Sequence, residues 1–158
     1  MAIYRVINSA GKYHDSHSCR DVIRYATSPE KTKPNGIFGG AVLPENTADA
    51  MEGVARVYRK DSGVHLRHSV LSFAPEEGVS VADAKAIARE AIKYYRSDYQ
   101  IIAAVHEDTD HPHIHFVMNT VSYRDGAKYH GEKKDYYAFQ QYMNEIVRPY
   151  GTHVELKK

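Results

Sequence analysis

The chain has 158 residues, of which 42% are hydrophobic, so it is long enough to fold as one domain around its own core. Its 21 basic and 20 acidic side chains nearly cancel, so net charge does not indicate a nucleic-acid partner, which would require a local basic surface. The single cysteine excludes an intrachain disulfide and a multi-cysteine zinc site, and no apolar run is long enough to span a membrane. We therefore expect one soluble, cytoplasmic domain over residues 1–158, with no membrane partner.

The first half of the chain alternates between strand and helix patterns. Residues 2–8 are rich in β-branched and aromatic side chains and predict a strand. Residues 18–26 predict a short helix, which ends ahead of Pro29 because the residue before a proline disfavours helix. Residues 33–40 contain a Lys-Pro-Asn-Gly run and a Gly-Gly pair, and these predict a loop. Apolar side chains at helical spacing then predict a second helix over residues 47–60.

The second half begins and ends with further strand and helix patterns. Residues 66–73 predict a strand, and residues 81–96 predict a helix that opens with a Ser-x-x-Asp capping box. A last helix is expected through residues 139–147, and Gly151 closes it. Residues 152–156 predict an edge strand.

Between these helices lie two more predicted strands, at residues 99–106 and 113–121. Asp108-Thr109-Asp110 supplies turn residues between them, so the two strands are expected to form an antiparallel hairpin. The order of the elements predicts an α+β domain with a single antiparallel sheet of about five strands, covered by helices. The His-x-His strand that begins at His113 then lies centrally in the sheet.

Histidines cluster in this hairpin. His113 and His115 alternate along a strand and so share one face, whereas the register of the hairpin decides whether His106 joins them. Three neutral imidazoles could hold one divalent ion and leave positions open, as catalytic metal sites do. Asp108 and Asp110 either orient these rings by accepting their second N–H or cap the turn. The pattern predicts a metal site or a catalytic role.

The same residues allow a second chemistry. Residues 111–117 nearly satisfy the pattern H-φ-H-φ-H-φ-φ of the histidine-triad nucleotide hydrolases. In that chemistry a histidine is the nucleophile and no metal is needed, whereas in the competing chemistry a tyrosine attacks while the histidines hold a metal. The histidine run alone leaves both chemistries open.

Three separated segments discriminate between them. Residues 22–32 (VIRYATSPEKT) place a tyrosine near a helix end before a Pro-Glu-Lys-Thr run, and residues 68–73 (HSVLSF) precede the long helix. Residues 106–119 have the form H-x-D-x-D-H-P-H-x-H-x-x-x-N. In this order the segments resemble the mobilisation-type DNA relaxases of the HUH endonuclease superfamily, which nick plasmid or conjugative-element DNA at a transfer origin. The resemblance spans most of the chain.

The resemblance implies an antiparallel sheet with the two-histidine strand at its centre, and a divalent metal ion, with Mn²⁺ or Mg²⁺ expected. It implies that Tyr25 is the nucleophile, and it makes Asp108 and Asp110 candidates for accepting a proton or orienting a ring. The implied metal ligands are His106, His113 and His115. The predicted DNA contacts are Lys31, Thr32, His68, Asn119, Lys133 and Lys134.

The implied reaction is a transesterification that forms a 5′-phosphotyrosyl link between protein and DNA and later rejoins the strand without ATP. The implied substrate is single-stranded or hairpin DNA at a transfer origin, because a site inside intact duplex is sterically shielded. An accessory DNA-binding protein and a secretion-system coupling protein are the partners that the resemblance suggests. Two other functions stay open, a histidine-triad nucleotide hydrolase and a non-catalytic DNA-binding or replication-initiator module.

Overall fold

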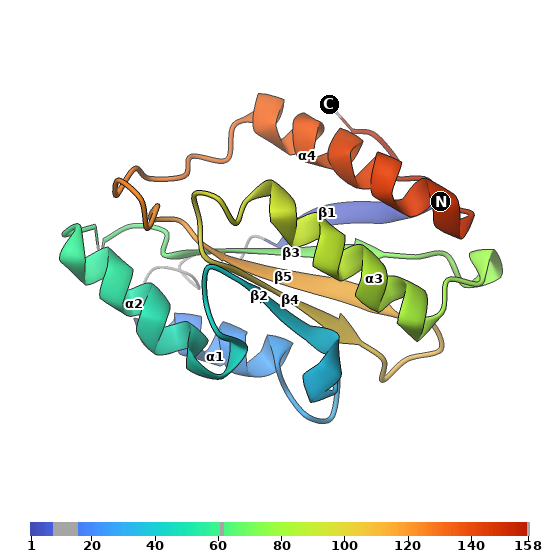
Figure 1. The fold of residues 1–158 in the computed structure, drawn as a ribbon, viewed down its shortest axis with the longest axis horizontal. Helices are drawn as coiled ribbons and strands as arrows, with labels where there is room; N and C mark the ends of the chain where they lie inside the picture. Colours follow the sequence, from blue (N-terminus) through green and yellow to red (C-terminus); the bar gives the residue numbers. More distant parts are fainter. Residues whose placement is uncertain (8–15, 61, 158) are drawn as a thin grey trace.

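A five-stranded antiparallel sheet organises the part of the chain that the computed structural model describes, residues 1–7, 16–60 and 62–157 (Figure 1). The strands lie in the order β1-β3-β5-β4-β2, so β5 is central. The strands are β1 (Ile3–Ile7), β2 (Ile37–Gly40), β3 (Leu66–Ser72), β4 (Ile101–His106) and β5 (His113–Asn119). The helices are α1 (Ser16–Ala26), α2 (Thr47–Val57), α3 (Val81–Ala91) and α4 (Lys133–Val147).

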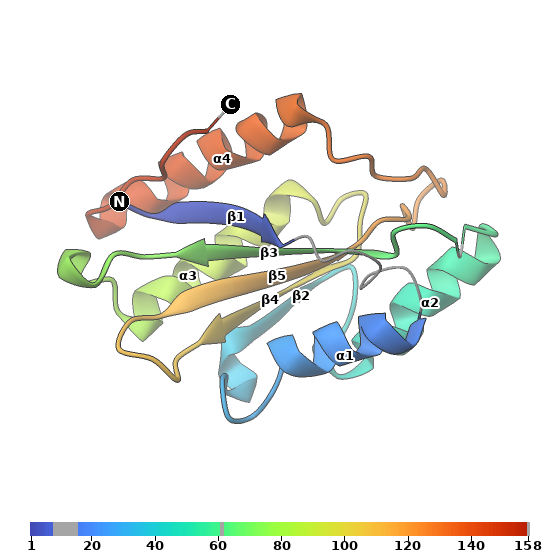
Figure 2. The same cartoon turned by 180° about the vertical axis from the view of Figure 1, so that it is seen from behind.

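The helices cover the two faces of the sheet in pairs. Helices α3 and α4 lie in front of the strands in Figure 1, and α1 comes forward when the molecule is turned in Figure 2. Side chains that point toward α3 and α4 form the larger core, which includes Ile114 and Phe116 of β5. A smaller cluster joins α1 and α2 to the opposite face and includes Ile102 and Val117.

The alternation of side chains along β5 determines where its histidines point. Because Ile114 and Phe116 face the core under α3 and α4, His113 and His115 face the opposite side, toward α1. His106 is the partner of His113 in the β4–β5 ladder and therefore points to the same side. The packing of apolar residues on one face thus gathers the histidines on the other.

The α+β class, the antiparallel sheet, the hairpin of β4 and β5 and the central position of the two-histidine strand are confirmed. The capping box is also confirmed, since Ser80 and Asp83 each bond the backbone N–H of the other at the start of α3. Helix α2 ends three residues before the predicted end at residue 60, and α3 gives way to a 3-10 turn from Ile92 to Tyr94. The predicted strand at 2–8 includes Asn8, which lies outside the described residues.

The loop predicted at residues 33–40 is wrong over its second half, because Pro34–Gly36 is a 3-10 turn whereas Ile37–Gly40 forms β2 and pairs with β4. The two glycines suggested a turn, but they lie in a strand, where the absence of a side chain lets neighbouring atoms lie close to the backbone. A Cβ on Gly39 would lie 2.1 Å from the carbonyl oxygen of Val42, and one on Gly40 would lie 2.7 Å from Cβ of Arg96. Sequence pattern alone does not separate these two uses of glycine.

The edge strand predicted at residues 152–156 is also wrong. Within the described residues this segment makes one isolated parallel bridge, from Val154 to Ala2. Side chains of α4 take up its backbone groups instead, since Asn144 accepts from the Val154 N–H and Gln140 bonds both the N–H and the carbonyl of Lys157. The segment therefore runs along α4 rather than extending the sheet. None of the helices described is long and apolar enough for a membrane span.

The tight packing of β2 is testable by substitution. We expect Gly39→Ala to lower the free energy of unfolding by about 1–3 kcal/mol, because its Cβ would meet a backbone oxygen that cannot move away cheaply. Gly53→Ala is the matched control within α2, where nothing lies within 4 Å of the added Cβ and stability should rise by about 0.5–1 kcal/mol. Urea denaturation measures both, and equal stability of the two variants would contradict this account of β2.

Candidate metal and nucleophile site

Three imidazoles meet on the face of the sheet that α1 covers. The ring centroids of His106 and His115 are 3.9 Å apart, and that of His113 lies 5.2 Å from His106 and 5.1 Å from His115. One nitrogen of each ring lies within 4.8 Å of the corresponding nitrogens of the other two. The structure therefore brings together the three residues predicted to bind a metal.

The ring of His106 is held by the end of α1. It is almost completely buried, and its Nε2 lies 2.8 Å from the backbone oxygen of Ala26. A carbonyl oxygen can only accept, so Nε2 carries the proton and donates it. This bond leaves Nδ1 with the lone pair that a metal ion would need.

The ring of His115 also has a partner for its second nitrogen. His115 Nδ1 lies 2.9 Å from Nε2 of the buried His68 on β3, and the two rings are stacked. If His115 donates to His68, its Nε2 is free to bind a metal, so His106 and His115 can each present one lone pair while the other nitrogen is bonded.

Burial keeps these rings neutral. It lowers the pKa of His106 and His113, and it lowers the pKa of His115 to about 2, with the neighbouring histidines adding to the effect. The charge of Asp108 acts in the opposite direction on His106 and His113 but does not outweigh burial. Neutral imidazoles are the form that binds transition metals, so this donor set fits a divalent ion.

Tyr25 lies beside the three histidines, near the end of α1. Val22 and Ala26 of the same helix are buried against the sheet, whereas the Tyr25 side chain is 46% exposed. Its ring meets those of His106 and His115 edge to face, with centroids 5.7 and 5.6 Å away. The predicted nucleophile and the predicted metal ligands are therefore neighbours, although they are far apart in the sequence.

The segment after α1 is joined to the β4–β5 turn at Lys31. Its Nζ lies 3.2 Å from a carboxylate oxygen of Asp108 and 5.1 Å from the centre of the Tyr25 ring, and its carbonyl accepts from the Glu107 N–H at 2.7 Å. Desolvation opposes ionisation of Asp108, but the hydrogen bond and the charge of Lys31, together with a backbone hydrogen bond and His106, outweigh it and lower the pKa of this carboxyl. The position of a cation between the phenol ring and the turn suits an approaching phosphate.

The two aspartates do not orient the rings in the way that the sequence suggested. The partners of the buried rings are the Ala26 carbonyl for His106 and the ring of His68 for His115. Asp108 bonds Lys31 instead, and Asp110 is exposed in the turn. Proton acceptance stays a prediction for both carboxylates.

The predicted DNA contacts fall into three groups. Lys31 is partly exposed at the site, as expected. Thr32 and Asn119 are buried, and His68 is buried as well but lines a cleft beside Tyr25. DNA contact by these three side chains stays a prediction. Lys133 and Lys134 open α4, which covers the face of the sheet opposite to the histidines.

The buried position of Asn119 has a clear physical reason. Its amide nitrogen donates to the Met51 carbonyl and to Gln100 Oε1, and its amide oxygen accepts from the Val121 N–H. A side chain with these three bonds fixes the end of β5 to its surroundings. His68 is likewise a partner of His115, because β3 pairs with β5, a pairing that the sequence does not specify.

Comparison with known proteins agrees with this geometry. A family model described as "Relaxase: MobA/VirD2-like, nuclease domain" matches residues 25–152, a range that starts at Tyr25 and includes the three histidines. Two proteins of Staphylococcus aureus named "Protein rlx" are similar to this chain, one 30% identical over 64% of the chain and the other 28% identical over 66%. The matched segments cover 31% and 33% of those relatives, so the chain spans about a third of their length.

The buried neutral rings predict how stability depends on pH. In the unfolded chain His115 has its ordinary pKa of 6.5, whereas in the metal-free folded protein its pKa is about 2. Below pH 6.5 the unfolded state therefore takes up a proton that the folded state does not, and stability falls with falling pH by about 1.4 kcal/mol per unit from this residue alone. His106 and His113 act in the same direction.

Urea denaturation in EDTA between pH 7 and pH 5 measures this dependence. His115→Asn should flatten the slope, and His153→Gln, which alters an exposed histidine, should leave it unchanged. A wild-type free energy of unfolding that is constant over this range would contradict the account.

Proposed function

The chain belongs to the MobA/VirD2-like relaxase nuclease family, and from that membership we propose that it nicks one strand of DNA at a transfer origin to mobilise a plasmid or conjugative element. The family makes the chain a DNA-nicking and strand-transferring enzyme of the HUH relaxase type. The transfer origin, the residue roles and the metal requirement of this chain are proposals. The observation that carries them is the contact of Tyr25 with two of the three clustered histidines.

We assign the nucleophilic attack to Tyr25. Its phenol oxygen attacks the scissile phosphorus, the bond from phosphorus to the 3′ oxygen breaks, and the released 3′-hydroxyl takes up a proton. The product is a 5′-phosphotyrosyl link that conserves the energy of the broken ester, so a 3′-hydroxyl can reverse the reaction and rejoin the strand without ATP. The exposure of the Tyr25 ring supports this role, because a strand can reach it without opening the fold.

We assign metal binding to His106, His113 and His115. A divalent ion held there supplies positive charge to the non-bridging oxygens of the phosphate. The three rings would contribute neutral lone pairs, and the second nitrogens of His106 and His115 are held by Ala26 and His68. Of the two proposed ions, an all-imidazole set favours Mn²⁺ over Mg²⁺, because Mg²⁺ prefers oxygen ligands.

A phenol is a weak nucleophile at neutral pH, so a proton acceptor is needed near Tyr25. We propose Asp108 for this role, with Asp110 as the second candidate. Asp108 is held at the site by Lys31, and its lowered pKa keeps it ionised and able to accept a proton, although the same shift makes it a weaker base. Lys31 is proposed to contact the phosphate as well, since it lies next to both the Tyr25 ring and the β4–β5 turn.

The proposed substrate is single-stranded or hairpin DNA. Lys133 and Lys134 could meet only a part of the strand that passes around the sheet to α4, because that helix lies on the other face. An accessory DNA-binding protein and a secretion-system coupling protein are proposed partners, the cytoplasm is the proposed location, and residues 1–158 are proposed to act as one nicking domain. The family match removes support from the histidine-triad hydrolase, and Tyr25 beside the histidines argues against a non-catalytic module.

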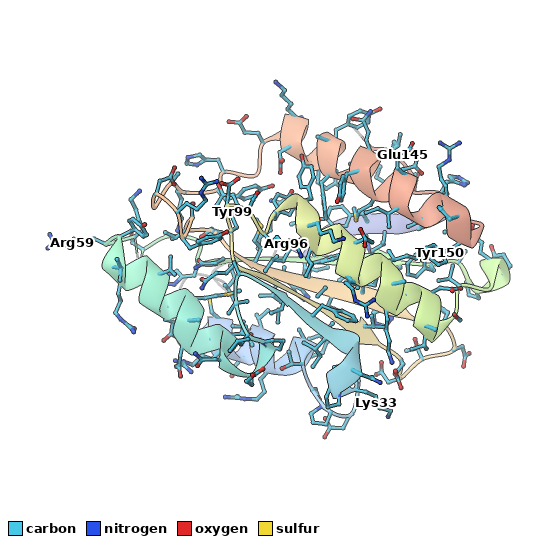
Figure 3. All side chains as sticks on the ribbon, viewed as in Figure 1. Lys33, Arg59, Arg96, Tyr99, Glu145 and Tyr150 are labelled. Carbon is cyan, nitrogen blue, oxygen red and sulfur yellow. The ribbon has the colours of Figure 1, made fainter. Side chains whose placement is uncertain are left out.

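The covalent intermediate is the direct test of this proposal. Wild-type protein incubated with Mn²⁺ and a random-sequence single-stranded DNA library should give a protein–DNA adduct that resists denaturation, and EDTA should prevent it. Tyr25→Phe should reduce the adduct to background. Tyr150→Phe, at the far end of the α4 region (Figure 3), is the matched control and should form the adduct normally. Mass spectrometry identifies the modified residue, and an undiminished adduct in Tyr25→Phe would contradict the assignment.

The support of His115 by His68 makes a second prediction. His68→Phe keeps a ring but removes the acceptor, so metal affinity should fall by about 10–100-fold. His68→Gln retains an acceptor oxygen and should bind metal more tightly than His68→Phe. Titration calorimetry with Mn²⁺ in the absence of DNA measures these affinities, with His153→Gln as the control. Unchanged affinity in His68→Phe would show that the contact has no role in metal binding.

A further inference from the structure

An open cleft of about 320 Å³ lies directly beside the proposed nucleophile. Helices α1 and α2 pack toward β4 and β5, and in Figure 2 none of the helices that the structure describes crosses β1 and β3 on this face. Tyr25 and His115 line the cleft together with His68 and Val70 of β3. The cleft is therefore next to the proposed position of the scissile phosphate.

The lining of this cleft combines apolar surfaces with one carboxylate. Ile7 at the end of β1, Val22 of α1 and Val70 of β3 supply the apolar side chains. Asp21 supplies the carboxylate and lies four residues before Tyr25, on the same side of the helix. Its carboxylate is 3.0 Å from the guanidinium of Arg24, but both side chains are exposed, so this ion pair is weak enough for a ligand to compete with it.

In-line attack decides which nucleotide lies next to the cleft. The leaving 3′ oxygen must be opposite the tyrosine oxygen, so the nucleotide on the 5′ side of the scissile phosphate points away from Tyr25. The nucleotide on the 3′ side is joined to the phosphorus through its 5′ oxygen, which is neither the attacking nor the leaving oxygen. This nucleotide stays attached to the enzyme after cleavage. The cleft is lined by Tyr25 and His115, which also belong to the proposed nicking site. It is therefore close enough to receive the nucleotide on the 3′ side of the scissile phosphate.

Resting on the proposed function, we propose that this cleft binds the base of the nucleotide that becomes joined to Tyr25, and that Asp21 selects a base with an exocyclic amine. Apolar side chains suit the flat faces of a base, and unstacked bases are read by hydrogen bonds at their edges. Cytosine, adenine and guanine each carry an amine that can donate to a carboxylate. Thymine has carbonyl oxygens at the equivalent positions, which repel it.

Mononucleotides test the cleft without any cleavage step. The nucleotides 5′-dCMP and 5′-dUMP differ at the C4 edge of the base. Cytosine carries an amine and a ring acceptor there, whereas uracil carries a carbonyl and a ring N–H. In both nucleotides the 5′-phosphate stands in for the scissile phosphate. Titrated with Mg²⁺ and followed by methyl NMR, 5′-dCMP should shift the signals of Ile7, Val22 and Val70 and bind about tenfold more tightly than 5′-dUMP. Asp21→Asn should bring the two affinities together, because an amide both donates and accepts. Arg24→Gln removes the competing cation and should keep the preference.

Three outcomes would overturn the inference. They are the absence of shifts at these methyl groups with millimolar nucleotide, equal affinity of wild-type protein for the two nucleotides, and the same preference in Asp21→Asn as in wild type. Sequencing the DNA that remains linked in the adduct separates this inference from the proposed function. An adduct whose first base is random leaves the nicking function standing and contradicts the cleft, whereas loss of the adduct with intact nucleotide preference contradicts only the nicking function.

Discussion

The hydrogen bond from His106 Nε2 to the Ala26 carbonyl is the interaction on which the rest of the site depends. It joins the end of β4 to the end of α1, and Ala26 is the residue after Tyr25. Carbonyls at a helix C-terminus lack partners within the helix and carry partial negative charge, so an imidazole N–H is a favourable donor there. One bond therefore places the tyrosine against the histidine cluster and leaves Nδ1 as the His106 nitrogen with a lone pair.

Hydrogen bonds to the ring nitrogens also explain how the sheet accommodates buried histidines. An unpaired ring nitrogen in the interior would be costly, and here His106 is bonded to Ala26 and His115 to His68. The opposite faces of β4 and β5 supply the apolar packing that fixes the two strands in register. The larger core lies on that face, and the histidines share the other face with the smaller apolar cluster.

Local pattern predicted the elements that carry the site, but not the partners of each side chain. Alternation along residues 113–119 and the turn at Asp108-Thr109-Asp110 were enough for a hairpin, whereas opposition of His106 and His113 depends on a register that the sequence does not give. Asn119 has the spacing of a functional residue, yet its amide bonds Gln100 and the Met51 backbone. The strand β2 was missed because it depends on pairing between distant segments, and the contact of His68 with His115 depends on such a pairing as well.

The tautomer of His106 is the most direct measurement of the central interaction. Long-range proton–nitrogen correlation NMR on the metal-free protein distinguishes the two ring nitrogens by their shifts. The account predicts a proton fixed on Nε2 and an unprotonated Nδ1, with the Nδ1 signal moving when a diamagnetic divalent ion such as Mg²⁺ or Zn²⁺ is added. A proton on Nδ1 in the metal-free protein would contradict it, because that ring could neither donate to Ala26 through Nε2 nor offer Nδ1 to a metal.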